Sequence, residues 1–214
     1  MDILSIVIQA FVVLFAITVH EASHGWAALK MGDPTAYAAG RVTLNPLAHI
    51  DLIGTVLLPL VLILAHQPAF GWAKPVPVNP YNLRHPRRDH LWISLAGPLA
   101  NLVTAAAALV ALRLTMRLAP RMTAASVWAK SVGGLAQILF AAVMINVALA
   151  VFNLIPIPPL DGSGILAGLL PDRAAAQYER LRPYGFILLI ILVYTNVLNL
   201  VFSPIQSLIL RLLR

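Results

Sequence analysis

The sequence has no cysteine and few charged residues. Of its 214 residues, 15 are Lys or Arg, 8 are Asp or Glu, and 60% are hydrophobic. Without cysteine, disulfide bonds, cysteine-ligated metals and thiol catalysis are all excluded. Soluble domains carry about 25% charged residues, whereas this chain carries 11% and has a mean hydropathy of +0.85. This composition excludes a soluble enzyme, a disordered tail and a secreted disulfide scaffold, and it predicts an integral membrane protein.

Long apolar runs predict an all-α polytopic membrane protein that forms a single domain over residues 1–214. The first run lacks a basic leader and a small-residue cleavage site, so it is interpreted as a retained helix rather than a signal peptide. A helix of about 20 residues crosses roughly 30 Å of hydrocarbon. We therefore expect about four full transmembrane helices, over residues 3–29, 91–112, 132–154 and 184–210.

Two segments do not fit the pattern of full transmembrane helices. Segment 52–66 is apolar but short, and it contains Pro59. Its length predicts a re-entrant or partial membrane segment. Residues 33–50 are mixed in composition, and the stretch 41–44 (Arg-Val-Thr-Leu) is rich in strand-forming residues. This composition is compatible with a small β-ribbon at the membrane edge.

The first apolar helix contains the pattern His20-Glu21-x-x-His24. Histidines four residues apart lie on one face of a helix, so the two side chains can bind one metal ion. The glutamate beside them can act as a general base toward water, as in zinc peptidases. This pattern also occurs by chance in soluble helices. Ionisable side chains inside a membrane helix are costly, however, and they indicate a functional site.

The small number of acidic residues points to a third ligand. A catalytic zinc site needs three protein ligands and one open position. Six of the eight acids lie in loops or at the ends of predicted spans, and only Glu21 and Asp161 are embedded in apolar sequence. With Glu21 assigned as the base, Asp161 is the expected third ligand. Pro156, Pro158 and Pro159 interrupt the helix before it, and this break would carry Asp161 toward the histidines.

Three segments resemble the signature sequences of the site-2 protease family, the intramembrane zinc metalloproteases of peptidase family M50. The resemblance extends over the three core helices, roughly half of the chain, in the family's order. The third segment is the most specific, because its several fixed residues are far rarer by chance than the histidine pattern. The segments are HEASHG at 20–25, SLAGPLAN at 94–101 and NLIPIPPLDG at 153–162.

This resemblance implies a zinc-dependent intramembrane endopeptidase. His20, His24 and Asp161 would bind one catalytic Zn²⁺, Glu21 would activate water, and Asn153 would contact the substrate or the oxyanion. The expected partners are the lipid bilayer and single-span membrane proteins, which would be cleaved in or near their transmembrane segments. A homo-oligomer is compatible with this reading. No PDZ or CBS domain is recognisable, so the chain would be a compact member of the family.

The net charge of +7 is interpreted as a signal of membrane orientation. Nucleic acid is not expected as a partner, because no basic segment carries interleaved aromatic residues. His20 and Asp161 can meet only if their helices run in the same direction, which requires that segment 52–66 does not cross the membrane. In that topology, nine of the 15 basic residues lie at the end that holds the site. The positive-inside rule then places the site nearer the cytoplasmic face of a bacterial inner membrane.

A membrane metal-ion transporter is the alternative function. Transport predicts several helices with ligands and more than one ion site, whereas the two carboxylates in apolar sequence both belong to one site here. Bound-zinc stoichiometry distinguishes the two functions. A scaffold without catalytic activity has no support, because all the expected catalytic residues are present.

Several other polar or small residues in the apolar regions have structural interpretations. Asn101 and Asn146 are predicted to hydrogen-bond between helices rather than to act in chemistry. The pair Gly97-Pro98 is predicted to serve helix packing. His49 is predicted to be an interfacial histidine with local hydrogen bonds, and the alternative for it is a role in supporting the metal site or in gating substrate.

Overall fold

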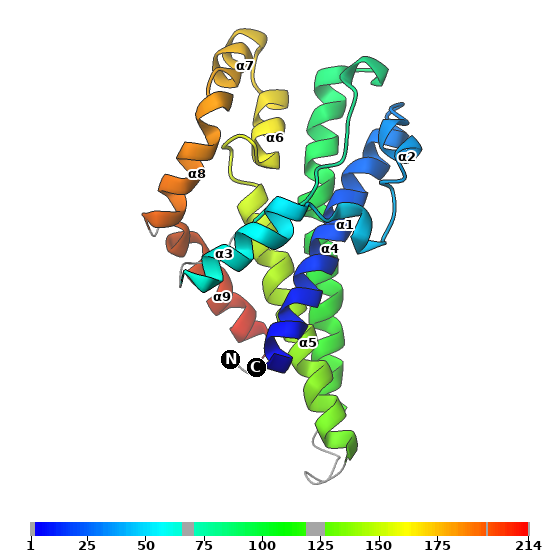
Figure 1. The fold of residues 1–214 in the computed structure, drawn as a ribbon, viewed down its shortest axis with the longest axis vertical. Coiled ribbons are helices and arrows are strands. Elements are labelled where there is room, and N and C mark those ends of the chain that lie inside the picture. The colour runs from blue at the N-terminus through cyan, green and yellow to red at the C-terminus, as the bar shows by residue number, and fades with distance from the viewer. Residues whose placement is uncertain (1–2, 66–70, 119–126, 196, 214) are drawn as a thin grey trace.

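The structure is a computed structural model that describes residues 3–65, 71–118, 127–195 and 197–213 (Figure 1). Within these ranges the chain is mainly helical and contains no strand. Three helices are long and apolar enough to cross a membrane, because each exceeds the length that roughly 30 Å of hydrocarbon requires. The predicted all-α membrane protein is thereby confirmed. The three helices are α1 (Ile3–Lys30), α4 (Pro86–Leu118) and α5 (Val127–Asn153).

Helix α4 lies at the centre of the fold and packs against α1, α5 and α6 (Asp161–Leu169). Helices α1 and α5 run in the same direction and α4 runs opposite to them (Figure 1), as the meeting of His20 and Asp161 requires. Small residues line these contacts, and Ala16, Ala28 and Ala150 have no exposed surface. Small side chains let helix backbones approach closely in lipid, where apolar surface alone does not drive association.

The fourth predicted span, over residues 184–210, is not one continuous helix. It forms α8 (Gly185–Tyr194) and α9 (Val197–Leu213), with a bend of 62° at the break, and residue 196 lies outside the described ranges. Helix α9 turns toward the core, where Ile209 packs with Ala108 and Val143. The guanidinium group of Arg113 also donates to the carbonyl of Leu212. The described residues thus contain three unbroken spans, or four if the bent pair crosses as one.

The β-ribbon expected within 33–50 is not formed. This region holds α2 (Thr35–Ala38), a 3₁₀ turn η1 (Pro46–His49) and irregular backbone between them. The stretch 41–44 is rich in strand-forming residues, but it pairs with no other strand among the described residues. The buried Arg41 side chain instead donates to the carbonyls of Ala48 and Lys74, and these bonds hold the loop in place.

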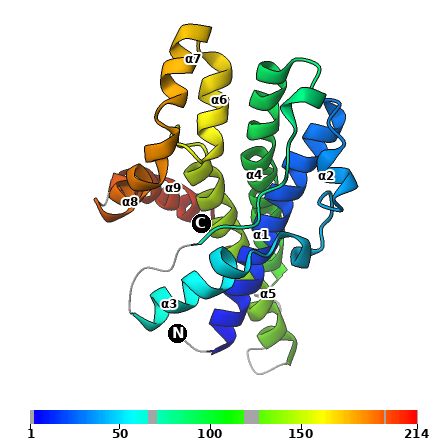
Figure 2. The ribbon, with the colours of Figure 1, turned by 45° about the horizontal axis from the view of Figure 1, so that its top comes forward.

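Segment 52–66 forms a short helical segment, made of the π-helical η2 (Leu52–Leu57) followed by α3 (Leu58–Leu64). It is shorter than a full span, as expected, and it runs across the direction of α1 (Figures 1 and 2). Residue 66 of the predicted segment lies outside the described ranges. Whether this segment enters the membrane and returns stays a prediction.

Residues 71–79 form an extended segment, here called the return segment, which leads back toward α4 through the 3₁₀ turn η3 (Pro80–Asn82). Asp33 fixes its end, because the fully buried carboxylate accepts hydrogen bonds from Asn79 N at 2.7 Å and Asn82 Nδ2 at 2.9 Å. Burial raises the pKa of Asp33. These hydrogen bonds and those from Thr35 lower it by more than burial raises it, so the pKa of Asp33 lies below its ordinary value.

Beyond α5, the proline-rich residues 154–160 form turns that include a cis Pro158–Pro159 bond, and α6 begins at Asp161. Helix α6 lies against α4 because its glycines remove side-chain bulk. A Cβ atom at Gly168 would lie 2.6 Å from Leu91 Cβ, and one at Gly164 would overlap Ser94 Oγ. The chain continues through α7 (Asp172–Glu179) and the turn η5 (Arg182–Tyr184) into α8. This packing brings the start of α6 to the part of α4 that also faces α1.

Candidate metal centre

Three predicted ligands meet where α1, α4 and α6 come together. The Nε2 atoms of His20 and His24 lie 3.1 Å apart, and these residues are only 5% and 8% exposed. Asp161 places Oδ2 3.0 Å from His20 Nε2 and Oδ1 3.3 Å from His24 Nε2. One ligand atom from each residue lies within 4.8 Å of the other two, and no second cluster of this kind occurs in the described part of the chain.

This donor set fits zinc. Two imidazole nitrogens and one carboxylate are ligands that zinc takes in catalytic sites, and three of them leave one position open. Asp161 Oδ2 is buried and has no hydrogen-bond partner, although His20 Nε2 is close to it. A buried carboxylate oxygen without a hydrogen bond is costly unless a cation compensates it. A bound cation would satisfy this oxygen.

Both histidines are oriented from their Nδ1 side. His24 Nδ1 lies 2.7 Å from the backbone oxygen of Ile93, and His20 Nδ1 lies 2.6 Å from Asn101 Oδ1. Histidines that bind metal usually donate from the second ring nitrogen to an oxygen, which leaves Nε2 for the metal. The predicted interhelical bonding of Asn101 and Asn146 is confirmed by a 2.8 Å hydrogen bond between them. The contact with His20 was not predicted, because helix spacing alone does not pair residues from α1 and α4.

Gly97 gives the histidines the space that they occupy. A Cβ atom at this position would lie 2.6 Å from His24 Cε1 and 2.7 Å from His20 Cε1, and it would also overlap His24 Nε2. The predicted packing role of the Gly97-Pro98 pair is confirmed for Gly97. The surface packed against Gly97 is formed by the predicted metal ligands themselves.

Glu21 points to the return segment rather than joining the ligands. Its Oε2 accepts a hydrogen bond from the backbone N–H of Val76 at 2.9 Å. Arg41 holds the same stretch, since its guanidinium donates to Lys74 O at 2.5 Å and to Pro75 O at 3.2 Å. Glu21 thus lies beside a histidine pair while its carboxylate is held by a backbone amide. The sequence of the loop carries no signal for this contact.

Asn153 and His49 lie outside the ligand cluster. Asn153 is the last residue of α5, and its side-chain nitrogen donates to Leu149 O at 3.0 Å within its own helix. His49 is 2% exposed, and its Nε2 donates to Thr43 O at 3.0 Å. The predicted local hydrogen bond of His49 is confirmed, and the ring is buried within the protein. Its position at the membrane interface stays a prediction.

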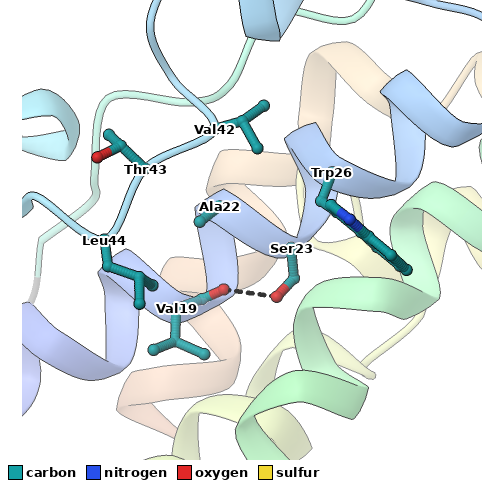
Figure 3. Close-up of a pocket in the computed structure, with 7 residues that line it drawn as sticks. All are labelled: Val19, Ala22, Ser23, Trp26, Val42, Thr43 and Leu44. Carbon is teal, nitrogen blue, oxygen red and sulfur yellow. Dashed lines mark hydrogen bonds between the residues drawn. The ribbon is translucent and has the colours of Figure 1, made fainter.

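A pocket of about 270 Å³ lies beside α1 (Figure 3). Helical spacing puts Ala22 and Trp26 on the side of α1 opposite to His24, so this pocket is not the metal centre. Ser23 Oγ donates to Val19 O at 2.7 Å within the helix, so its hydrogen is already used. The lining residues are Val19, Ala22, Ser23, Trp26, Val42, Thr43 and Leu44.

Comparison with known proteins agrees with this geometry. Residues 8–194 match the family model described as "Peptidase family M50". The chain is 36% identical over 191 residues to "Putative zinc metalloprotease YwhC" of Bacillus subtilis. The aligned residues cover 89% of this chain and 82% of that protein. It is 31% identical over 189 residues to "Putative zinc metalloprotease Rip2" of Mycolicibacterium smegmatis, covering 87% of this chain and 66% of that protein.

Rip2 of Mycobacterium tuberculosis is 28% identical over 186 residues, with the same two coverages. No solved structure matches the chain. None of these matches supports the metal-ion transporter alternative. The family match covers most of the chain, and the relatives carry the names of zinc metalloproteases. The chain therefore belongs to peptidase family M50, the site-2 proteases, and is an intramembrane zinc metalloprotease.

Proposed function

We propose that His20, His24 and Asp161 hold the single catalytic zinc ion and that Glu21 is the general base of peptide hydrolysis. The observation that carries this proposal is the convergence of three ligand atoms within 4.8 Å from two helices far apart in the sequence. The buried Asp161 oxygen without a hydrogen bond supports it independently. Glu21 is the remaining acid in this part of α1, and its carboxylate is not one of the clustered ligands.

The roles of the side chains follow from their positions. Bound zinc supplies Lewis acidity, which polarises the scissile carbonyl and makes water more acidic. Glu21 takes the proton from the attacking water on a carboxylate oxygen and later passes it to the leaving nitrogen. The Val76 N–H donates to Oε2 at 2.9 Å and fixes the position of this carboxylate. Asn153, at the end of α5 and before the turns that lead to Asp161, contacts the substrate carbonyl or the developing oxyanion.

The substrates are single-span membrane proteins. A peptide bond within a regular helix is protected by its neighbouring turns, so the substrate helix unwinds locally before it is cleaved. The site suits this class of substrate, because its ligands lie on and beside membrane-spanning helices rather than on a soluble domain. Cleavage of such proteins would amount to regulated intramembrane proteolysis. Association of the protease into a homo-oligomer stays a prediction.

Removal of zinc is expected to abolish cleavage, and added Zn²⁺ is expected to restore it. The purified chain should hold one tightly bound zinc ion, because the ligands form one cluster. His20→Ala should lose this ion. The control His85→Ala should keep it, since His85 is an exposed side chain in the turn before α4. Metal analysis and cleavage of a single-span test protein measure both effects. Cleavage that survives chelation, or several tightly bound ions per chain, would contradict the proposal.

The end of the molecule that holds the site faces the cytoplasm of a bacterial inner membrane. Helices α1 and α5 run in the same direction (Figure 1), which supports the topology in which segment 52–66 does not cross the membrane. In that topology nine of the 15 basic residues lie at the end that holds the site, and the positive-inside rule places this end in the cytoplasm. Because the chain has no cysteine, single cysteines can report its orientation. In intact cells, a membrane-impermeant thiol reagent should label Met116→Cys, near the far end of α4, and should leave Ala176→Cys on α7 unlabelled. The reverse labelling pattern would overturn this orientation.

A further inference from the structure

Behind His20, two buried asparagines form a chain of hydrogen bonds that crosses three helices. The amide nitrogen of Asn101 on α4 donates to Ala16 O on α1 at 3.0 Å and to Asn146 Oδ1 on α5 at 2.8 Å. The amide nitrogen of Asn146 donates in turn to Ala142 O at 2.9 Å. Asn101 is 0% and Asn146 is 1% exposed, so water does not replace these bonds.

The two backbone carbonyls give this chain a single direction. A carbonyl oxygen only accepts, so the nitrogen of Asn146 faces Ala142 and its oxygen faces Asn101. Asn101 then uses both amide hydrogens, one on Ala16 O and one on Asn146 Oδ1. Its own oxygen is left to face His20 Nδ1 at 2.6 Å. Because that oxygen only accepts, His20 carries a hydrogen on Nδ1, and Nε2 is the ring nitrogen that can bind a metal.

The two histidines reach this tautomer in different ways. His24 faces the backbone oxygen of Ile93, which is an acceptor in any arrangement. His20 faces a side-chain amide, which would be a donor if it rotated by 180°. A donor at this position would favour the tautomer with hydrogen on Nε2, and that tautomer cannot bind a metal through Nε2. Asn146 and Ala16 O oppose the rotation, since a rotated Asn101 would point its oxygen at two acceptors.

We infer that Asn101 and Asn146 are positioning residues that hold His20 in its metal-binding tautomer. This inference rests on the proposed metal centre. Asn101 acts directly on His20, and Asn146 acts through Asn101 without touching a ligand. The buried pair thus extends the site from α1 through α4 to α5. Its role goes beyond holding the helices together.

The test is the affinity of the full-length purified chain for zinc, measured by competition with a chelator. Asn101→Leu removes the acceptor for His20 and should weaken zinc binding about 10- to 100-fold. Asn146→Ala leaves the contact with His20 intact but lets Asn101 rotate, and it should weaken binding by up to about 10-fold. Thr104→Val is the matched control, because its hydroxyl bonds only to Ala100 O within α4. It should bind zinc as the unmodified chain does.

A second measurement is made on the unmodified chain, and a variant serves only to assign one signal. The ¹⁵N spectrum of histidine in the unmodified metal-free chain should show His20 with hydrogen on Nδ1, and the His20→Ala spectrum assigns that signal. A His20 ring without hydrogen on Nδ1 would overturn the inference. The inference would also be overturned if Asn101→Leu and Asn146→Ala bound zinc as the unmodified chain does. If His20→Ala lost zinc in the same experiment, the proposed metal centre would still hold. If His20→Ala itself kept zinc at full affinity, the metal centre would be wrong.

Discussion

Replacing Glu21 with glutamine is expected to abolish cleavage while one zinc ion stays bound. Glutamine has nearly the same shape, and its amide oxygen can still accept the hydrogen bond from Val76 N–H. It cannot take a proton from water, however, and a positioned general base contributes about 10²- to 10⁴-fold to the rate. The clustered ligand atoms come from three other residues, so zinc affinity should be retained. Cleavage of a single-span substrate and zinc content of the same preparation measure the two effects separately.

Glu179→Gln is the matched control, because Glu179 is the other glutamate in the sequence. It lies on α7 and forms an ion pair of 3.0 Å with Arg182, in which both side chains are largely exposed. Exposed pairs contribute little to stability, so this variant should cleave at the normal rate. Normal cleavage by Glu21→Gln would show that the base is wrongly assigned. Loss of zinc from that variant would show that Glu21 holds the metal or its ligands.

Replacing Gly97 with alanine is expected to lower cleavage about 100-fold and to weaken zinc binding. The added methyl group would lie 2.6 Å from His24 Cε1 and 2.7 Å from His20 Cε1. Carbon atoms do not pack at such distances, so the imidazole rings or α4 must shift. Because α4 is held by α1, α5 and α6, the shift falls largely on the rings. Displacing a reacting group by about 1 Å can cost about 100-fold in rate.

Gly133→Ala is the control for the effect of alanine in a membrane helix. A Cβ atom at Gly133 would meet nothing within 4 Å, and the residue lies within α5 as Gly97 lies within α4. This variant should keep its zinc affinity and cleavage rate, and alanine should favour the helix by up to about 1 kcal/mol. Wild-type zinc affinity in Gly97→Ala would mean that the histidine pair is not packed against α4.

Much of the candidate metal centre could be predicted because its signals are local or compositional. His20 and His24 lie on one face of α1 for the simple reason that a helix repeats every 3.6 residues. Asp161 stood out because only two acids lie in apolar sequence. The all-α membrane fold follows from hydropathy in the same way. None of these predictions required knowledge of which helices touch.

The β-ribbon was wrongly predicted, and one continuous helix over 184–210 was not confirmed, because distant contacts compete with the local signal in both places. The composition of residues 41–44 favours a strand, but a strand needs a partner, and Arg41 instead bonds to carbonyls near residues 48 and 74. Hydropathy likewise predicts one span over 184–210. There, contacts of Ile209 with α4 and α5 turn α9 away from the direction of α8.

By itself, the sequence determined that this chain folds in a membrane, which side-chain types form the proposed ligand set and base, and the family to which the chain belongs. These properties depend on side-chain type and on spacing along one helix. Only the tertiary structure decided that the Val76 amide holds Glu21, that Gly97 makes room for the histidines and that Asn101 faces His20. Each contact joins segments more than 50 residues apart. Such pairs are chosen by helix packing and by the need to satisfy buried polar groups, which no local pattern encodes.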